Sequence, residues 1–357
     1  MRRLTIILLL LSACLTGFAK VREQAVRYMS VDQHGEPVEL SGLLSVPEHP
    51  KGLILIPHYT ISANDNAPSV KPTGEAKYYR EDFVLLMPDY IGYGLTRDRV
   101  HPYLAGELTA RNTVDMLFGL RPMLDSMALG ISLDSIYIVG FSQGGATALW
   151  TLKLLEEQYA DRVTVRKCYA GGAPVDVASA YDVSVSRGKT LLPLFIPMLM
   201  AGTNEAYDLN LQFDRLYTPA MKRYDEKYVA AKRYNIPQLF FRFPSRKMTH
   251  WLTPDGMNLS NAEARRLYEG LKRSSLVHYP ISEQVPADTI CPAWVPRTQL
   301  YVFHSTKDDV VTFFCARHLR SCYGHLPNIT WDFDNYGSHY TSARIFYPRV
   351  KKFLEQE

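Results

Sequence analysis

A pentapeptide at positions 140–144, GFSQG, restricts the fold of this chain more than any other feature of its sequence. It follows an apolar run at 135–139 that is rich in β-branched and aromatic residues, which is typical of a buried parallel strand. Small residues and then a helical pattern follow it, at 145–155. A strand, a Gly-x-Ser-x-Gly turn and a helix together form a nucleophile elbow, which holds its serine on a tight, strained turn. We therefore predict that Ser142 is a nucleophile, the alternative being a glycine-rich turn with a bystander serine.

Residues 1–19 have the pattern of an export signal. Two arginines precede an apolar run that is too short to span a bilayer. Small residues favour cleavage after Ala19, but positions 11–14 (LSAC) resemble a bacterial lipoprotein box, in which Cys14 would carry the lipid. Cleavage after Ala19 is favoured because strand-like sequence begins soon after Cys14. The mature protein is expected to be periplasmic or secreted, with a membrane-anchored lipoprotein as the alternative.

The remaining cysteines and the charge narrow the function classes. Outside the cytoplasm Cys168, Cys291, Cys315 and Cys322 could form disulfides, but their spacing does not fix the pairing. The sequence has no C-x-x-C motif and no His/Cys cluster with zinc spacing, so no metal or cofactor is predicted. The net charge is +4 and both signs are mixed along the chain, which is not the pattern of a nucleic-acid-binding protein. The oligomeric state stays open.

Strand and helix patterns alternate along most of the chain. Two strands joined at a turn open it, and short apolar runs and helical stretches follow. This order predicts an α/β fold with a mostly parallel central sheet flanked by helices. The predicted strands lie at 25–32, 38–46, 53–57, 83–88, 135–139, 165–171, 300–304 and 329–333, and the predicted helices at 104–129, 145–155 and 344–354.

Strand patterns are missing between about 176 and 296. A connection of this length requires helices of its own, so we expect a helical cap at 176–296, inserted into a hydrolase-like core at 20–175 and 297–357. Helical patterns are expected around 224–234 and 261–271. Its position, over the carboxyl ends of the strands, is where ligands bind in such folds. The apolar run at 191–200 could line an acyl pocket or be the cap's own core.

A serine nucleophile requires a histidine base and a carboxylate that orients the histidine. In this architecture the chain order is serine, acid, histidine. Asp308 follows the strand at 300–304 and is the predicted acid, with Asp309 as the alternative and helix capping as the structural role for either. His339 lies in a glycine-containing loop between the last strand and the last helix, so we predict that it is the base.

Acyl transfer also requires backbone N–H donors for the oxyanion. One is expected from Gln143, at the start of the helix after the nucleophile. The other is expected from the loop after the strand at 53–57, where Thr60 and Tyr59 remain alternatives.

With these residues in place, the chain resembles the α/β-hydrolase superfamily, specifically the bacterial relatives of secretory lipases and carboxylesterases. The resemblance rests on the HYT loop at 58–60 with 64–69 behind it, the PDYIGYG motif at 88–94 and HPY at 101–103. It continues through 140–144, AGGAP at 170–174, Asp308 and His339. It implies hydrolysis of carboxylic esters through an acyl-enzyme on Ser142, and it treats Asp89 as part of a structural turn. The family usually has glycine at position 59, and tyrosine there narrows the loop.

Three functions follow, in order of preference. The first is an exported serine esterase that cleaves a small-molecule ester with a short or medium acyl group. The second is a prolyl-type serine peptidase on the same fold. The third is a non-catalytic binding protein that retains the fold.

Overall fold

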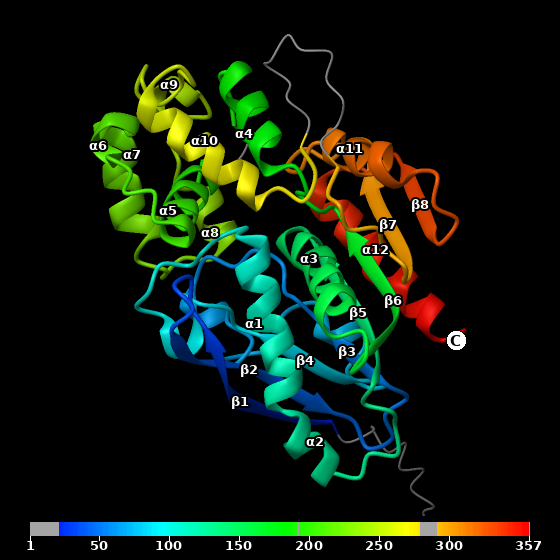
Figure 1. Cartoon of the computed structure of the whole chain (residues 1–357). Helices are drawn as coiled ribbons and strands as arrows, with labels where there is room; N and C mark the ends of the chain where they lie inside the picture. Colours follow the sequence, from blue (N-terminus) through cyan, green and yellow to red (C-terminus); the bar gives the residue numbers. More distant parts are fainter. Residues whose placement is uncertain (1–20, 191–192, 279–290, 357) are drawn as a thin grey trace, which may run out of the picture.

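Eight strands form one sheet at the centre of the computed structural model, which describes residues 21–190, 193–278 and 291–356 (Figure 1). The strand order is β1-β2-β4-β3-β5-β6-β7-β8. The β1–β2 and β2–β4 pairs are antiparallel, and all the other neighbours are parallel. The predicted α/β fold class is therefore confirmed. The strands are β1 (Arg22–Val31), β2 (Pro37–Val46), β3 (Leu53–Leu55), β4 (Val84–Pro88), β5 (Ser135–Phe141), β6 (Thr164–Gly171), β7 (Gln299–Ser305) and β8 (Ile329–Asp334).

Helices cover both faces of the sheet, which explains why its inner strands are apolar throughout. Successive side chains of a strand point to opposite faces, so Leu53 and Leu55 belong to the core under α1 and α3, whereas Ile54 and Ile56 belong to the core under α12. The sheet thus has a hydrophobic core on each side. The helices of this part are α1 (Gly106–Gly119), α2 (Arg121–Ser126), α3 (Gln143–Gln158), α11 (Phe314–Tyr323) and α12 (His339–Leu354), with 3₁₀ turns at Asn64–Asn66, Ala76–Tyr78 and Gly94–Thr96.

Two helices differ from their predicted bounds for local reasons. The helix predicted at 104–129 is divided at Leu120, because Pro122 lies in the first turn of α2 and lacks the N–H that a continuous helix needs. The last helix begins at His339 instead of 344. Ser338 is its N-cap, and the serine side chain accepts a hydrogen bond from the N–H of Thr341.

The segment between β6 and β7 contains helices and no strand of the sheet among its described residues (Figure 1). These helices pack around a further hydrophobic cluster, in which Ile196, Met198 and Met200 of the apolar run are buried together with Leu267. Tyr103 and Ala146 of the sheet part belong to the same cluster. The helices lie beyond the carboxyl ends of the parallel strands (Figure 1). They are α4 (Val177–Ser186), α5 (Phe195–Tyr207), α6 (Phe213–Leu216), α7 (Pro219–Tyr224), a π-helical turn (Asp225–Val229), α8 (Ile236–Phe240), α9 (Met248–Trp251) and α10 (Ala262–Ser274).

The helix predicted around 224–234 is shorter than expected. Its helical backbone ends with the π-helical turn at Val229. Lys232 then adopts a positive φ of 49°. Its ammonium group donates hydrogen bonds to the carbonyls of Gly92 and Arg99, both at 2.5 Å. The side chain of Lys232 thus fastens this segment to the loop after β4, a long-range contact that sequence periodicity cannot show.

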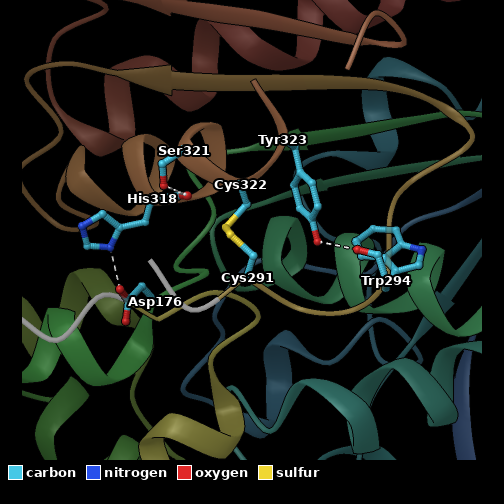
Figure 2. The surroundings of a disulfide bond; sticks show 7 residues. All are labelled: Asp176, Cys291, Trp294, His318, Ser321, Cys322 and Tyr323. Atoms are coloured by element: carbon cyan, nitrogen blue, oxygen red, sulfur yellow. Dashed lines mark hydrogen bonds and ion pairs between the residues drawn. A yellow bond between two sulfur atoms is a disulfide. The ribbon is translucent and has the colours of Figure 1, made fainter. Parts of the chain in front are cut away.

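A buried carboxylate joins the helical segment to the sheet. Asp176 is the N-cap of α4 and accepts the N–H of Ser179 at 3.1 Å. It also binds Nδ1 of His318 on α11 at 2.6 Å (Figure 2) and Nδ1 of His278 at 3.2 Å. These hydrogen bonds lower the pKa of Asp176 to about 2, against the opposing effect of its burial. One side chain therefore ties together three segments that are far apart in sequence.

A disulfide lies beside this junction. Cys291 and Cys322 are bonded, which fastens the chain that leads back into β7 to helix α11 (Figure 2). Nearby, the hydroxyl of Tyr323 donates a hydrogen bond to the carbonyl of Trp294 at 2.8 Å. Cys168 and Cys315 are buried free thiols. The sequence left this pairing open, because it depends on which side chains the fold brings together.

The proposed export signal at 1–19, including Cys14, lies outside the described residues. Within the described ranges, no helix combines the length and apolar character that crossing a membrane requires.

Breaking the Cys291–Cys322 disulfide is expected to destabilise the protein. The bond links residues 31 positions apart, and a cross-link restricts the unfolded chain, which typically stabilises the fold by about 2–4 kcal/mol. Urea unfolding should show a lower midpoint for the wild type in the presence of a reductant. Cys322→Ser is the matched control: its midpoint should already be lowered and should not respond to reductant. An unchanged wild-type midpoint would contradict the prediction.

Candidate active site

Ser142 lies on a strained turn between the end of β5 and the start of α3. Its backbone has φ 58° and ψ −126°, a conformation that is uncommon for a residue other than glycine. The turn is held by the N–H of Ser142, which donates to the carbonyl of Gly171 on the neighbouring strand β6 at 2.9 Å. Ser142 is partly exposed, although most residues around it are buried. The fold thus presents this hydroxyl at the carboxyl edge of the sheet.

Two glycines of the pentapeptide are required by close backbone contacts. A Cβ atom on Gly140 would lie 2.1 Å from the carbonyl oxygen of Gly144, inside the turn itself. A Cβ atom on Gly144 would lie 2.1 Å from the carbonyl oxygen of Pro57. The second contact brings the loop after β3 against the elbow. Glycine at position 144 therefore lets two separate loops meet at the serine.

His339 is hydrogen-bonded to both other members of the predicted triad. Its Nε2 lies 2.9 Å from Oγ of Ser142, and its Nδ1 lies 2.7 Å from Oδ2 of Asp308. Since a carboxylate only accepts hydrogen bonds, Nδ1 carries the proton and Nε2 is free to accept the serine hydroxyl. The structure thus brings together three residues that follow β5, β7 and β8, in the orientation that proton transfer from serine requires.

The two neighbouring aspartates occupy different positions. Asp308 is buried, and its two oxygens have separate partners: Oδ2 binds the imidazole of His339, whereas Oδ1 accepts the N–H groups of Val310 and Val311 at 3.0 and 2.8 Å. Asp309 instead accepts the backbone N–H of His339 at 2.9 Å through Oδ1. The capping role and the histidine contact therefore coincide in Asp308, while Asp309 holds the backbone at the start of α12.

The other histidines that were considered as bases have other hydrogen-bond partners. His304 is buried, which lowers its pKa, and its Nε2 donates to the carbonyl of Val311 at 2.9 Å. The same Nε2 lies 3.8 Å from Oδ2 of Asp308, the oxygen that binds His339. His318 binds Asp176 at the junction described above. His250 lies on α9 beside Trp251, and His325 is exposed after α11.

The loop after β3 carries two candidate oxyanion donors, and their N–H groups differ. The N–H of Tyr59 donates to Oε1 of Glu75 at 3.4 Å. For the N–H groups of Thr60 and Gln143, no acceptor is present among the described residues. The side chain of Thr60 is fixed by a 3.0 Å hydrogen bond between its hydroxyl and that of Tyr103. Two backbone donors therefore remain available beside the elbow.

The ring of Tyr59 is partly buried. Its hydroxyl accepts the N–H of Gly74 at 3.3 Å. The ring packs against a small cluster of Ile61, Ala67 and Tyr93. The ring of Tyr59 is thus held against the residues that follow it in the loop and against Tyr93.

His101 is hydrogen-bonded to the side chain of Gln143 in the elbow, a role that was not predicted from the sequence. The side-chain amide of Gln143 donates to Nε2 of His101 at 2.8 Å, and Nδ1 of His101 donates to the carbonyl of Ile91 at 2.8 Å. Burial lowers the pKa of His101 to about 3, so this ring is neutral. His101 also lines a cavity of about 320 Å³ between the loop after β4 and the helical segment, together with Met198 and Lys232.

Asp89 of the PDYIGYG motif is enclosed by hydrogen-bond donors. Its Oδ2 accepts the hydroxyls of Ser41 and Ser69, both at 2.5 Å, and its Oδ1 accepts the N–H of Ser69 at 2.8 Å. These bonds join β2 to the loop after β4 and to the loop that contains Ser69. Asp89 has a structural position away from Ser142. Across the described ranges, histidine, cysteine and acidic side chains form no group suited to holding a metal ion.

The known proteins to which this chain is similar include lipases and esterases. No family model matches the chain. A secreted triacylglycerol lipase, LIP5 of Malassezia furfur, is 24% identical over 245 residues, which is 67% of this chain. The chain matches 56% of the length of that relative.

Solved structures show the same fold. A putative hydrolase from Legionella pneumophila has a TM-score of 0.81 at 18% identity, covering 95% of this chain and 89% of its own. The rice cell wall degrading esterase LipA of Xanthomonas oryzae has a TM-score of 0.75 at 17% identity, covering 94% and 89%. Lipase A of Candida antarctica in its closed state has a TM-score of 0.62 at 15% identity, covering 91% and 77%. The chain has the α/β-hydrolase fold that these proteins share.

Gly144→Ala is expected to separate the elbow from the loop after β3. The added methyl group would meet the Pro57 carbonyl, so one backbone must move, at a cost of roughly 1–3 kcal/mol as in other overpacked sites. Thermal unfolding should show a lower melting temperature. Gly52→Ala is the control, since its Cβ would lie 3.6 Å from the Phe83 ring, an ordinary contact. Equal melting temperatures for the two variants would contradict the prediction.

Proposed function

We propose that this protein is an exported serine hydrolase that cleaves carboxylic esters through an acyl-enzyme on Ser142. The observation that carries the proposal is the continuous hydrogen-bonded series from Oγ of Ser142 through His339 to Asp308. A serine hydroxyl becomes a nucleophile when a neighbouring imidazole can accept its proton, and that is the arrangement here. The similarity to a secreted triacylglycerol lipase and to LipA, a cell wall degrading esterase, supports esters as substrates.

In the proposed reaction, Oγ of Ser142 attacks the ester carbonyl carbon while Nε2 of His339 accepts the hydroxyl proton. The carbonyl oxygen becomes an oxyanion. His339 then donates that proton to the leaving alcohol as the ester bond breaks, which leaves an acyl group on Ser142. Water, deprotonated by the same histidine, then attacks the acyl carbon. The bond between that carbon and Oγ breaks, the imidazolium returns the proton to Oγ of Ser142, and the acid is released. Asp308 stays ionised and stabilises the imidazolium in both steps.

We assign the oxyanion donors to the N–H groups of Gln143 and Thr60. Both lack an acceptor among the described residues, whereas the N–H of Tyr59 is taken by Glu75. Gln143 is the first residue of α3, where the helix dipole favours a negative charge. The close approach of Gly144 to Pro57 brings together the two segments that carry these donors.

The proposed substrate is a small ester with a short or medium acyl group. The partly buried ring of Tyr59 occupies space behind the donor loop that a glycine would leave open. Export is proposed from the basic and apolar pattern at 1–19 and from the similarity to a secreted lipase. A lipid anchor at Cys14 would place the same enzyme at a membrane surface.

Purified protein is expected to hydrolyse p-nitrophenyl esters, with the highest kcat/KM for acyl chains of about two to eight carbons. Ser142→Ala should lower kcat by roughly 10⁴-fold or more, because it removes the nucleophile. A fluorophosphonate probe should label the wild type and not the variant, as mass spectrometry of the intact protein would show. Equal hydrolysis rates for the two proteins would refute the proposed function, and hydrolysis of proline amides without esters would favour the peptidase.

Asp308→Asn and Asp309→Asn distinguish the two neighbouring carboxylates. An amide at 308 has one acceptor oxygen, which the N–H groups of Val310 and Val311 would take. Its NH2 group would then face Nδ1 of His339, so kcat should fall by about 10³–10⁴-fold. The amide at 309 would still offer an oxygen to the backbone N–H of His339, so a less than tenfold change is expected there. Steady-state kinetics on one ester measure both. A larger loss for the 309 variant would assign the acid to Asp309 instead.

A further inference from the structure

Two buried side chains hold the backbone of Tyr59 from opposite sides. Oε1 of Glu75, which is 1% exposed, accepts its N–H. Nδ1 of His58, a fully buried residue, lies 2.6 Å from its carbonyl oxygen and donates to it. Burial lowers the pKa of His58 and keeps this ring neutral. Both polar backbone groups of one residue are thus fixed by side chains.

This arrangement determines where the next N–H points. The carbonyl of Tyr59 and the N–H of Thr60 belong to one planar trans peptide, so they point in opposite directions. The bond from His58 therefore directs the N–H of Thr60 away from the His58 ring. The bond to Glu75 fixes the preceding peptide, which prevents the loop from turning and presenting the N–H of Tyr59 in its place.

The surroundings of Glu75 are unusual for a carboxyl group. Four tyrosines from four separate segments lie near enough for its charge to raise their pKa, and no cation forms an ion pair with it among the described residues. Those tyrosines are Tyr59 after β3, Tyr79 after the 3₁₀ turn, Tyr90 after β4 and Tyr347 on α12.

The second oxygen of this carboxyl, Oε2, has no hydrogen-bond partner of ordinary geometry in the described residues, and neither has the nearby hydroxyl of Thr73. Burial raises the pKa of Glu75 to about 7, although the Thr73 hydroxyl and the N–H of Tyr59 act in the opposite direction. A neutral carboxyl can donate its proton from Oε2 to the Thr73 oxygen while Oε1 accepts the N–H of Tyr59. An apolar side chain would avoid the desolvation of a carboxyl here, so packing alone does not account for Glu75.

We propose that Glu75 is a positioning residue for the oxyanion site, which it serves in its neutral form by holding the N–H of Tyr59 so that the N–H of Thr60 faces the substrate. The proposal rests on the ester-hydrolase function above. Glu75 does not touch the substrate; it acts through the loop. In its ionised form it places a negative charge behind the loop in which the oxyanion develops, and like charges raise the energy of the transition state.

The test compares two variants of equal length, Glu75→Gln and Glu75→Met, on one p-nitrophenyl ester between pH 5.5 and 9. Glu75→Met removes the acceptor and should lower kcat at least tenfold, with KM changed less than twofold, since the donor acts mainly in the transition state. Glu75→Gln keeps an oxygen acceptor without charge and should retain kcat within about threefold.

The pH profile supplies a readout that a merely structural role would not move. As pH rises through about 7, wild-type Glu75 loses its proton, so wild-type kcat should decline above that pH. In Glu75→Gln this decline should disappear, because the group stays neutral. A profile of Glu75→Gln that matches the wild type would overturn the proposal. This comparison remains decisive if Glu75→Met fails to fold.

Amide hydrogen exchange of the peptide that covers 57–62 separates this proposal from the ester-hydrolase function. In Glu75→Met the amide of Tyr59 should exchange at least tenfold faster than in the wild type, and in Glu75→Gln it should stay protected. This holds even for a protein without esterase activity, so loss of the proposed function and loss of the positioning role are distinguishable. Unchanged exchange and unchanged kcat in Glu75→Met would refute the positioning role.

Discussion

The approach of Gly144 to the carbonyl of Pro57 is the contact on which the site depends. Without a side chain at this position, the elbow after β5 and the loop after β3 pack backbone to backbone. The serine and the N–H of Gln143 come from the first segment, and the N–H of Thr60 comes from the second. A single methyl group between them would separate the proposed nucleophile from one of its proposed oxyanion donors. The chemistry therefore requires glycine there for steric reasons and not for turn geometry alone.

Four buried carboxyl groups near this edge of the sheet show how the surroundings decide the role of a residue type. Asp89 is enclosed by serine donors and joins loops. Asp176 is held by two histidines and a helix N-terminus, which keep it ionised. Asp308 has one oxygen for its own turn and one for the imidazole. Glu75 is buried without a paired cation, and its burial raises its pKa to about 7, which favours the neutral form.

Apolar packing and polar ties together join the helical segment to the sheet. The apolar cluster of the helices also contains Tyr103, Leu104 and Ala146 of the sheet part. The ammonium of Lys232 and the carboxylate of Asp176 add hydrogen bonds to the loop after β4 and to α11. The disulfide of Cys322 fastens the returning chain beside the second of these ties (Figure 2). The polar ties are directional, so they add a fixed orientation to the apolar contact.

The sequence by itself determined the strands, their α/β order and the elbow, because apolar periodicity and glycine spacing are local properties of the chain. It also placed Ser142, Asp308 and His339 in order. Only the tertiary structure distinguished Asp308 from Asp309 and Thr60 from Tyr59, because the two members of each pair contact different distant atoms. Asp308 binds the imidazole of His339, whereas Asp309 accepts a backbone N–H. The N–H of Thr60 has no acceptor among the described residues, whereas the N–H of Tyr59 donates to Glu75. The roles of Glu75 and His101 and the pairing of the cysteines could not be predicted from the sequence, because the partners of these residues lie far away along the chain and are brought near only by folding.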